Sequence, residues 1–208
     1  LWDVETGSER ALLTYDSYTL PVFSPDSREI ALLTPNHAVQ LWDIATQSAR
    51  LTLPGPVNDT IYAAGGTRLI TYGETAFDLW DTATGENLAH GDYQFEEGDR
   101  GVTAQLSPDE AALLIRSRSG SGHVAAELWQ ISDPAVLHML PLADYDHTVF
   151  TAFSGDSRFL VIASDSVGGI DLFSTQTGAQ IAHLDEQIGS PYNSNETPLR
   201  YLTFNQAG

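Results

Sequence analysis

The sequence of 208 residues contains no cysteine and no lysine, and its nine basic residues are all arginine. Without cysteine, disulfide bonds and thiolate metal sites are excluded. Hydrophobic runs all fall well short of the roughly 18 residues that a membrane-spanning helix requires, so we expect no membrane insertion. The compartment is unknown from the sequence, with the cytoplasm slightly favoured.

Acidic residues dominate the charge. There are 28 aspartates and glutamates, and the net charge is -19. A surface of this sign repels phosphate backbones and anionic lipid heads, so we expect no nucleic-acid partner. A basic protein partner remains open, and so does the plainer alternative that the acidity only keeps the protein soluble.

Two short motifs recur in phase along the chain. Leu-Trp-Asp occurs at residues 1–3, 41–43 and 79–81, with variants at 128–130 and 172–174. The aromatic positions are 40, 38, 49 and 44 residues apart. Upstream of the complete copies lies Ser-Pro-Asp or Ser-Gly-Asp, at residues 24–26, 107–109 and 154–156, with Gly-Gly-Thr at 65–67 in the remaining copy. A period of about 40 to 45 residues is typical of four-stranded propeller blades.

The best copy, residues 21–53, predicts four short strands. Val22 and Phe23 end the first, and residues 30–33, 39–42 and 49–53 form the others. Residues 24–27 suit a type I turn because proline presets its second position. No helical period is present, so the chain is predicted to be all-β.

These motifs resemble the WD40 repeat family, and its divergent bacterial members in particular. The resemblance implies a β-propeller of four-stranded antiparallel blades and covers nearly the whole chain. The family's Gly-His pair is missing from every copy, and its turn aspartate is replaced by Asn36 and Glu74, with Asp165 in a third copy. We therefore expect all four tryptophans in the core, but not the family's buried hydrogen-bond network.

The domain expected is a single partial propeller over residues 1–208. Complete blades are predicted at 21–53, 60–90, 102–140 and 149–184, with partial blades at 1–13 and 200–208. A propeller must close to protect its strand edges. The chain is therefore either an arc of a longer propeller, whose remaining blades would be partners, or a small ring in which both terminal pieces share one blade. The arc is the favoured hypothesis.

Residues suited to catalysis or metal binding do not converge in the sequence. The most ligand-rich stretch, Asp144-Tyr145-Asp146-His147, could hold a cation, although a polar loop is the better interpretation. The expected first strands, 21–23, 61–63, 103–106 and 150–153, carry no charged residue. We therefore predict no enzyme, no cofactor and no metal site.

The long connections between blades, at 91–102, 141–149 and 185–200, mix acidic and aromatic residues. Aromatic side chains in polar loops are typical anchors of protein interfaces, and acidic neighbours favour a basic partner. The predicted partner-binding residues are Tyr93, Phe95, Glu96, Glu97, Asp99, Asp144, Tyr145, Asp146 and Tyr192. The function predicted is a non-catalytic protein-interaction scaffold, and the resemblance implies a place in a larger multidomain protein. The alternatives are an enzyme or a small-ligand or metal-binding propeller that uses the central channel, and a structural spacer.

Overall fold

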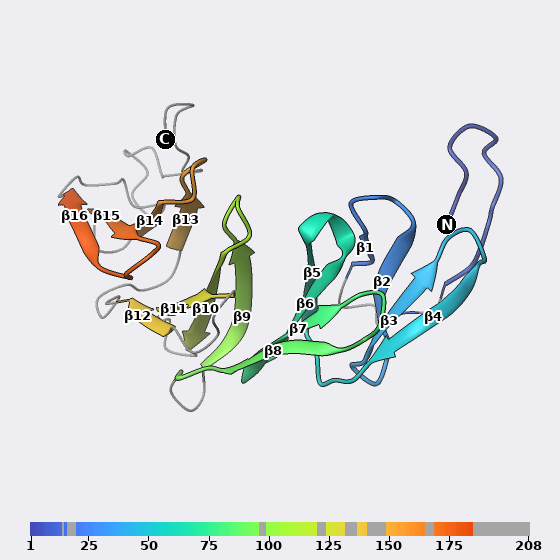
Figure 1. The fold of residues 1–208 in the computed structure, drawn as a ribbon, viewed down its shortest axis with the longest axis horizontal. Helices are drawn as coiled ribbons and strands as arrows, with labels where there is room; N and C mark the ends of the chain where they lie inside the picture. Colours follow the sequence, from blue (N-terminus) through green and yellow to red (C-terminus); the bar gives the residue numbers. More distant parts are fainter. Residues whose placement is uncertain are drawn as a thin grey trace, which may run out of the picture. The chain divides into compact units, whose positions relative to one another are not determined.

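The computed structural model describes residues 1–13, 15, 20–95, 99–119, 124–131, 137–140, 149–164 and 169–184. Within these ranges the chain is all-β, with sixteen strands in four antiparallel four-stranded sheets (Figure 1). Each sheet is built from four strands that are consecutive in the sequence. This architecture confirms the predicted fold class, that of WD40-type propeller blades.

The strand bounds are as follows. The first sheet contains β1 (Val22–Phe23), β2 (Glu29–Leu33), β3 (Val39–Asp43) and β4 (Ser48–Leu53). The second contains β5 (Asp59–Ala63), β6 (Arg68–Tyr72), β7 (Ala76–Asp81) and β8 (Asn87–Asp92). The third contains β9 (Asp99–Leu106), β10 (Ala112–Ser119), β11 (Val124–Gln130) and β12 (Leu137–Leu140). The fourth contains β13 (Val149–Phe153), β14 (Phe159–Ser164), β15 (Gly169–Ser174) and β16 (Gln180–Leu184).

A serine-led turn joins the first two strands in three of the sheets. In the first sheet, the amide of Ser27 donates to the carbonyl of Ser24 over 2.9 Å, as a type I turn requires. The Ser24 hydroxyl donates to Asp26 over 2.7 Å and accepts from the amide of Glu29. The same serine-to-aspartate bond recurs in Ser107–Asp109 and Ser154–Asp156. In the second sheet, a 3-10 turn over Ala64–Gly66 takes this place, and it is the only helical element in the described ranges.

An aspartate organises the turn between the third and fourth strands. Asp81 Oδ1 accepts from the amides of Ala83 and Thr84 and from the Thr84 hydroxyl. These bonds, led by that from the Thr84 amide, lower the pKa of Asp81. Gly85 then adopts a positive φ of 76°, which glycine reaches without strain. The hydrogen bonds of Asp81 all lie within three residues, so this turn depends on the local sequence.

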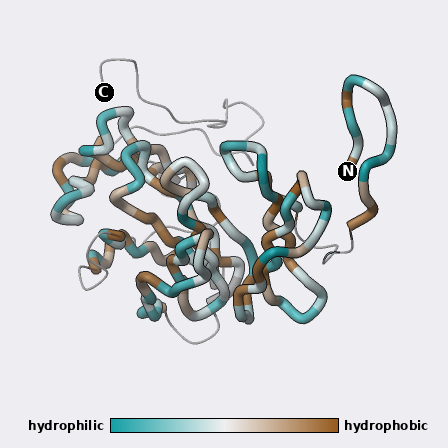
Figure 2. Tube along the Cα trace, turned by 45° about the vertical axis from the view of Figure 1, so that its right-hand side comes forward, coloured by the Kyte–Doolittle hydropathy of each residue, from teal (hydrophilic) through white to brown (hydrophobic). Residues whose placement is uncertain are grey.

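The chain forms two compact units, residues 1–92 and 93–208. In the first unit, Leu41 and Leu53 of the first sheet share one buried cluster with Leu69 of the second. In the second unit, Leu128 and Leu160 belong to a cluster that joins the third and fourth sheets. Figure 2 shows hydrophobic (brown) and hydrophilic (teal) stretches that follow one another along the trace, with teal at many of its outer loops.

Three of the four tryptophans are buried as predicted, namely Trp42, Trp80 and Trp129. The prediction is wrong for Trp2, whose exposed fraction is 63%. Trp2 is held by a single bridge to Glu9, and no further described strand pairs with this hairpin to cover the indole.

Two of the first strands begin earlier than the sequence predicted. β5 begins at Asp59, and β9 begins at Asp99 and includes Arg100. The expectation that these strands carry no charge is therefore wrong, because the pairing extends beyond the apolar residues that identified them. Separately, no helix in the described part of the chain has the length and apolar character to cross a membrane.

Candidate functional site

Of the predicted partner-binding residues, the structure describes the side chains of Tyr93 and Phe95. Both are half-buried, and their ring centroids lie 5.2 Å apart with planes tilted by 43°. Asp99 begins β9, three residues before the predicted start of that blade at residue 102. The remaining predicted residues lie outside the described ranges: Glu96, Glu97, Asp144, Tyr145, Asp146 and Tyr192.

The segment that carries this aromatic pair is fixed by a buried carboxylate. The amide of Gln94 donates to Glu127 Oε1 over 2.5 Å, across a separation of 33 residues. The second oxygen of Glu127 accepts from Trp129 Nε1 over 2.9 Å. Glu127 has no exposed surface, and burial raises the pKa of its carboxyl although these two bonds act in the opposite direction. Tyr93 and Phe95 are thus presented by a backbone that is anchored to the core of the third sheet.

A second candidate site lies between the first and second sheets, within residues 1–92. The connection from β4 to β5, residues 54–58, passes between two hairpin loops. On one side the amide of Val57 donates to the carbonyl of His37 over 2.9 Å. On the other, the amide of Asn58 donates to the carbonyl of Tyr72 over 2.8 Å. This connection forms one wall of a cavity of about 670 Å³, which we call the β4–β5 cleft.

Two glycines permit this close passage of three chain segments. A Cβ atom on Gly55 would lie 1.8 Å from the carbonyl oxygen of His37. A Cβ atom on Gly73 would lie 2.8 Å from the carbonyl oxygen of Pro56. Both distances are shorter than non-bonded atoms tolerate, so any larger residue at either position must displace backbone.

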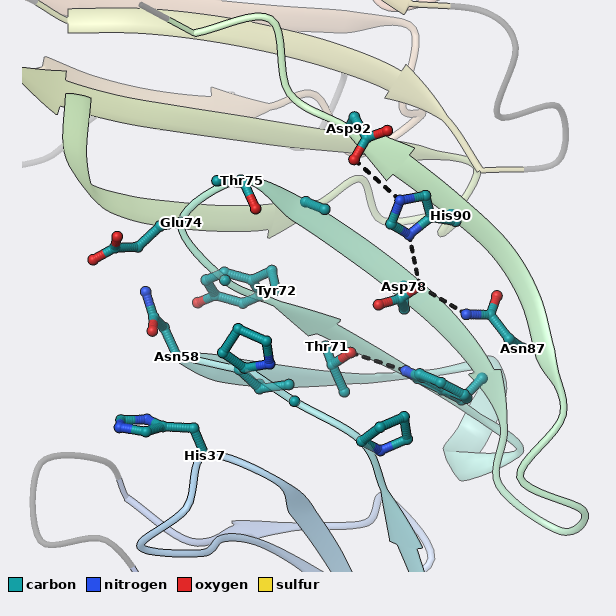
Figure 3. A pocket seen from close by; sticks show the side chains of 17 residues that line it. His37, Asn58, Thr71, Tyr72, Glu74, Thr75, Asp78, Asn87, His90 and Asp92 are labelled. Atoms are coloured by element: carbon teal, nitrogen blue, oxygen red, sulfur yellow. Dashed lines mark hydrogen bonds and ion pairs between the residues drawn. The ribbon is translucent and has the colours of Figure 1, made fainter. Parts of the chain in front are cut away.

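The β4–β5 cleft has a mainly apolar floor and a polar rim that includes three acidic residues. Trp80, Tyr72, Thr71 and Val57 are buried at the floor, beside Pro54 and Pro56. The rim consists of His37, Asn58, Glu74, Thr75, Asp78, Asn87, His90 and Asp92 (Figure 3).

A histidine is held between two carboxylates at this rim. His90 Nδ1 lies 2.8 Å from Asp78 Oδ1, and His90 Nε2 lies 3.2 Å from Asp92 Oδ1. Asn87 Nδ2 donates to the same Asp78 oxygen over 2.7 Å. The hydrogen bond with Asp78, and to a lesser extent the one with Asp92, raises the pKa of His90. An imidazolium donates from both nitrogens, which is the protonation state that this arrangement favours.

The same strand position carries a polar group in every sheet, but in different surroundings. Asp78 is paired with His90 across β7 and β8, and Asp171 with His183 across β15 and β16. The His183 Nδ1 atom lies 2.6 Å from Asp171 Oδ1, which repeats the contact of the second sheet. The Asp171 side chain is only 6% exposed, whereas that of Asp78 is 29% exposed. The corresponding residues of the other sheets are Gln40 and Glu127.

The buried polar network that the sequence analysis expected to be absent survives in part. Trp80 Nε1 donates to Thr71 Oγ1 over 2.9 Å in the second sheet. In the third sheet, the Trp129 indole donates to Glu127 instead. The expectation is therefore wrong for these two blades, because an acceptor on the same face of the sheet replaces the missing partners.

Sequence reasoning missed the β4–β5 cleft. It considered the long connections between blades, whereas the cleft depends on the short connection 54–58. The sequence did contain a signal for the cleft: Asp78 and Trp80 are two residues apart, and so are His90 and Asp92. In a strand, this spacing places both residues of each pair on the same face. Within the described ranges, no group of three or more histidine, aspartate and glutamate side chains is arranged to hold a metal ion.

No family model matches the chain. A stretch of 59 residues is 44% identical to the Arabidopsis thaliana protein described as cell division cycle 20.1, cofactor of APC complex. That match covers 26% of this chain and 13% of the Arabidopsis protein.

Among solved structures, the chain is similar to a chain of the mitotic checkpoint complex, with a TM-score of 0.60 and 18% identity. This likeness covers 88% of the present chain and 56% of the other. A chain of Kuenenia stuttgartiensis hydrazine synthase gives a TM-score of 0.53 at 11% identity, covering 74% and 51%. The chain thus spans about half the length of each solved chain, and at these identities the likeness concerns the fold alone. The described residues therefore fold as four-stranded antiparallel blades of the WD40 β-propeller type.

Proposed function

We propose that this chain is a non-catalytic protein-interaction scaffold, part of a larger protein, whose acidic and aromatic loops bind a partner with a basic surface. The observation that carries the proposal is the Tyr93–Phe95 pair on a backbone anchored by Glu127. Aromatic side chains are frequent anchors of interfaces, and a segment ordered before binding loses less conformational entropy on binding.

Charge supports a basic partner. The chain carries 28 acidic and nine basic residues, so its field attracts cationic surfaces and speeds their association. The predicted loop residues that lie outside the described ranges, among them Glu96, Glu97 and Asp144, belong to this proposal on the basis of sequence.

The comparisons support a role in protein assembly. One relative is named a cofactor of the APC complex, and one similar structure is a chain of the mitotic checkpoint complex. Hydrazine synthase is similar in fold at 11% identity, and this likeness transfers no chemistry.

The remaining blades of the same propeller are also proposed as partners of this chain. Exposed apolar residues within the first twenty positions support this part of the proposal. Trp2, Leu12 and Leu20 are all largely exposed. Packing against another four-stranded blade is the contact that such residues make in a closed propeller.

The proposal is tested by peptide binding. An immobilised peptide array should retain the chain on arginine-rich peptides and not on acidic ones, and added salt should weaken retention. The double variant Tyr93→Ala, Phe95→Ala should lose at least about tenfold in affinity, since anchor residues each contribute about 1 kcal/mol or more.

A matched control is Phe23→Ala, which removes an exposed aromatic from β1 in the first sheet. Its affinity should equal that of the unmodified chain. Retention that ignores salt, peptide charge and charge reversal within residues 91–102 would contradict the proposal.

A further inference from the structure

The β4–β5 cleft combines negative charge with an apolar floor. Three carboxylates line it, those of Glu74, Asp78 and Asp92. No arginine is among the residues that line the cleft in the described part of the chain, and its only cationic candidates are the imidazoles of His37 and His90. The three carboxylates outnumber the one imidazolium that the contacts of His90 favour, so the cleft carries an excess of negative charge, which favours a cationic occupant.

The floor suits the stem of a long basic side chain. Pro54 and Pro56 are exposed and offer aliphatic surface, and Trp80 and Tyr72, each 6% exposed, add a small aromatic part of the lining. Arginine and lysine bury their methylene stems on such surfaces and keep the charged end near polar groups. The volume of about 670 Å³ exceeds that of one side chain, so flanking peptide also has room.

Asp78 supplies an oriented acceptor at the rim. Its Oδ1 atom is held by Asn87 and His90, which fixes the plane of the carboxylate. Its Oδ2 atom makes no hydrogen bond with any described residue, and in Figure 3 it is turned away from His90 toward the middle of the cleft. A carboxylate held in this way is ready to accept from a guanidinium without further ordering.

We infer that the β4–β5 cleft is a binding site for an arginine side chain of a protein partner. The inference rests on the proposed function, because a basic partner is what would deliver such a side chain. It adds a specific pocket, whose lining includes Asp92 immediately before the Tyr93–Phe95 segment, and a residue, Asp78, that selects for charge.

The direct test is a titration with N-acetyl-arginine-N-methylamide, followed by the indole N–H resonance of Trp80. The neutral isostere N-acetyl-citrulline-N-methylamide serves as the ligand control. Arginine should shift the Trp80 resonance saturably, and citrulline should not. Equal shifts with both ligands, or none with arginine, would overturn the inference.

Two variants locate the effect. Asp78→Asn removes the charge while its amide oxygen keeps the position that accepts from Asn87 and His90, so the variant should fold and bind arginine about tenfold more weakly. Asp171→Asn removes the same charge from the equivalent position of the fourth sheet, outside the cleft, and should leave the affinity within about twofold. Equal weakening by both variants would mean that only net charge matters and would overturn the inference.

Protonation of His90 should compete electrostatically with the ligand, because an imidazolium beside Asp78 and Asp92 neutralises part of the negative charge that attracts a guanidinium, although it contacts only the Oδ1 atom of Asp78. The hydrogen bond with Asp78 raises the pKa of His90, so competition begins above the ordinary histidine range as the pH falls. Arginine affinity should therefore decrease from about pH 8 to about pH 5.5. His37 and Glu74 also line the cleft. The variant His90→Gln should reduce this pH dependence, and an unchanged pH profile would contradict the competition.

The peptide array separates this inference from the proposed function. Capture of arginine-rich peptides that is lost on Tyr93→Ala, Phe95→Ala but unaffected by Asp78→Asn would overturn the cleft inference and leave the scaffold proposal standing. Saturable arginine binding in the cleft, together with an array that shows no preference for basic peptides, would overturn the scaffold proposal and leave the cleft as a small-ligand site.

Discussion

Replacing Thr71 by valine should remove one buried hydrogen bond at almost constant volume. Thr71 is only 1% exposed, and its hydroxyl accepts a hydrogen bond from Trp80 Nε1 over 2.9 Å. Valine leaves the buried indole N–H without an acceptor. An unsatisfied buried donor costs about 1–3 kcal/mol, so the free energy of unfolding should fall by about that amount.

A double-mutant cycle isolates the bond. In the background Trp80→Phe there is no indole donor, and Thr71→Val should then cost less by about 1 kcal/mol or more. The fourth sheet already contains this apolar pair, with Ile162 at the position of Thr71 and Phe173 at that of Trp80, both fully buried. The double variant thus resembles an apolar pair that the chain itself uses, with valine in place of isoleucine.

Urea unfolding followed by far-ultraviolet circular dichroism is the suitable assay, since tryptophan fluorescence changes with Trp80→Phe. The midpoint should move while the slope with urea stays constant. A coupling energy near zero would refute the reasoning, because it would mean that water or another group satisfies the indole equally well.

Further predictions concern the contact between sheets, the cleft wall and a buried acid. Arg50 donates hydrogen bonds to Glu29 and to the carbonyls of Thr82 and Ala83, which follow β7 of the second sheet. Because these bonds are partly exposed, Arg50→Ala should lower the free energy of unfolding by about 1–2 kcal/mol. The melting temperature should fall by about 2–4 °C for each kcal/mol lost. Gly55→Ala should displace the cleft wall and abolish the arginine-induced shift of Trp80, whereas Gly155→Ala, whose Cβ meets nothing within 4 Å, should leave it unchanged in the same titration. Burial raises the folded-state pKa of Glu127, so its contribution to stability is present at low pH and lost as the pH rises through that pKa. Urea unfolding at several pH values measures this effect: the difference in unfolding free energy between the unmodified chain and Glu127→Gln should shrink as the pH rises. A difference that grows with pH would contradict a raised pKa of Glu127.

The repeated strand position of Asp78, Glu127 and Asp171 shows how one blade pattern supports different local roles. In the third sheet the carboxylate is fully buried and anchors a neighbouring segment. In the second sheet it is partly exposed and borders a cavity. The position is therefore set by the blade, and its role is set by what packs over it.

The sequence by itself determined the all-β class, the phase of the blades and the turns. These features depend on local interactions: Ser24 bonds within five residues, and Asp81 within three. Their hydrogen bonds form wherever the motif occurs, so the motif predicts them.

Tertiary structure alone decided the candidate site and the exceptions to the pattern. The β4–β5 cleft requires residues 54–58 to pass between the loops at His37 and Gly73, and the anchor of Gln94 requires a residue 33 positions away. The exposure of Trp2 depends likewise on which strands cover its hairpin. Such contacts join segments distant in sequence, and their geometry follows from packing and close backbone approach, which no local motif encodes.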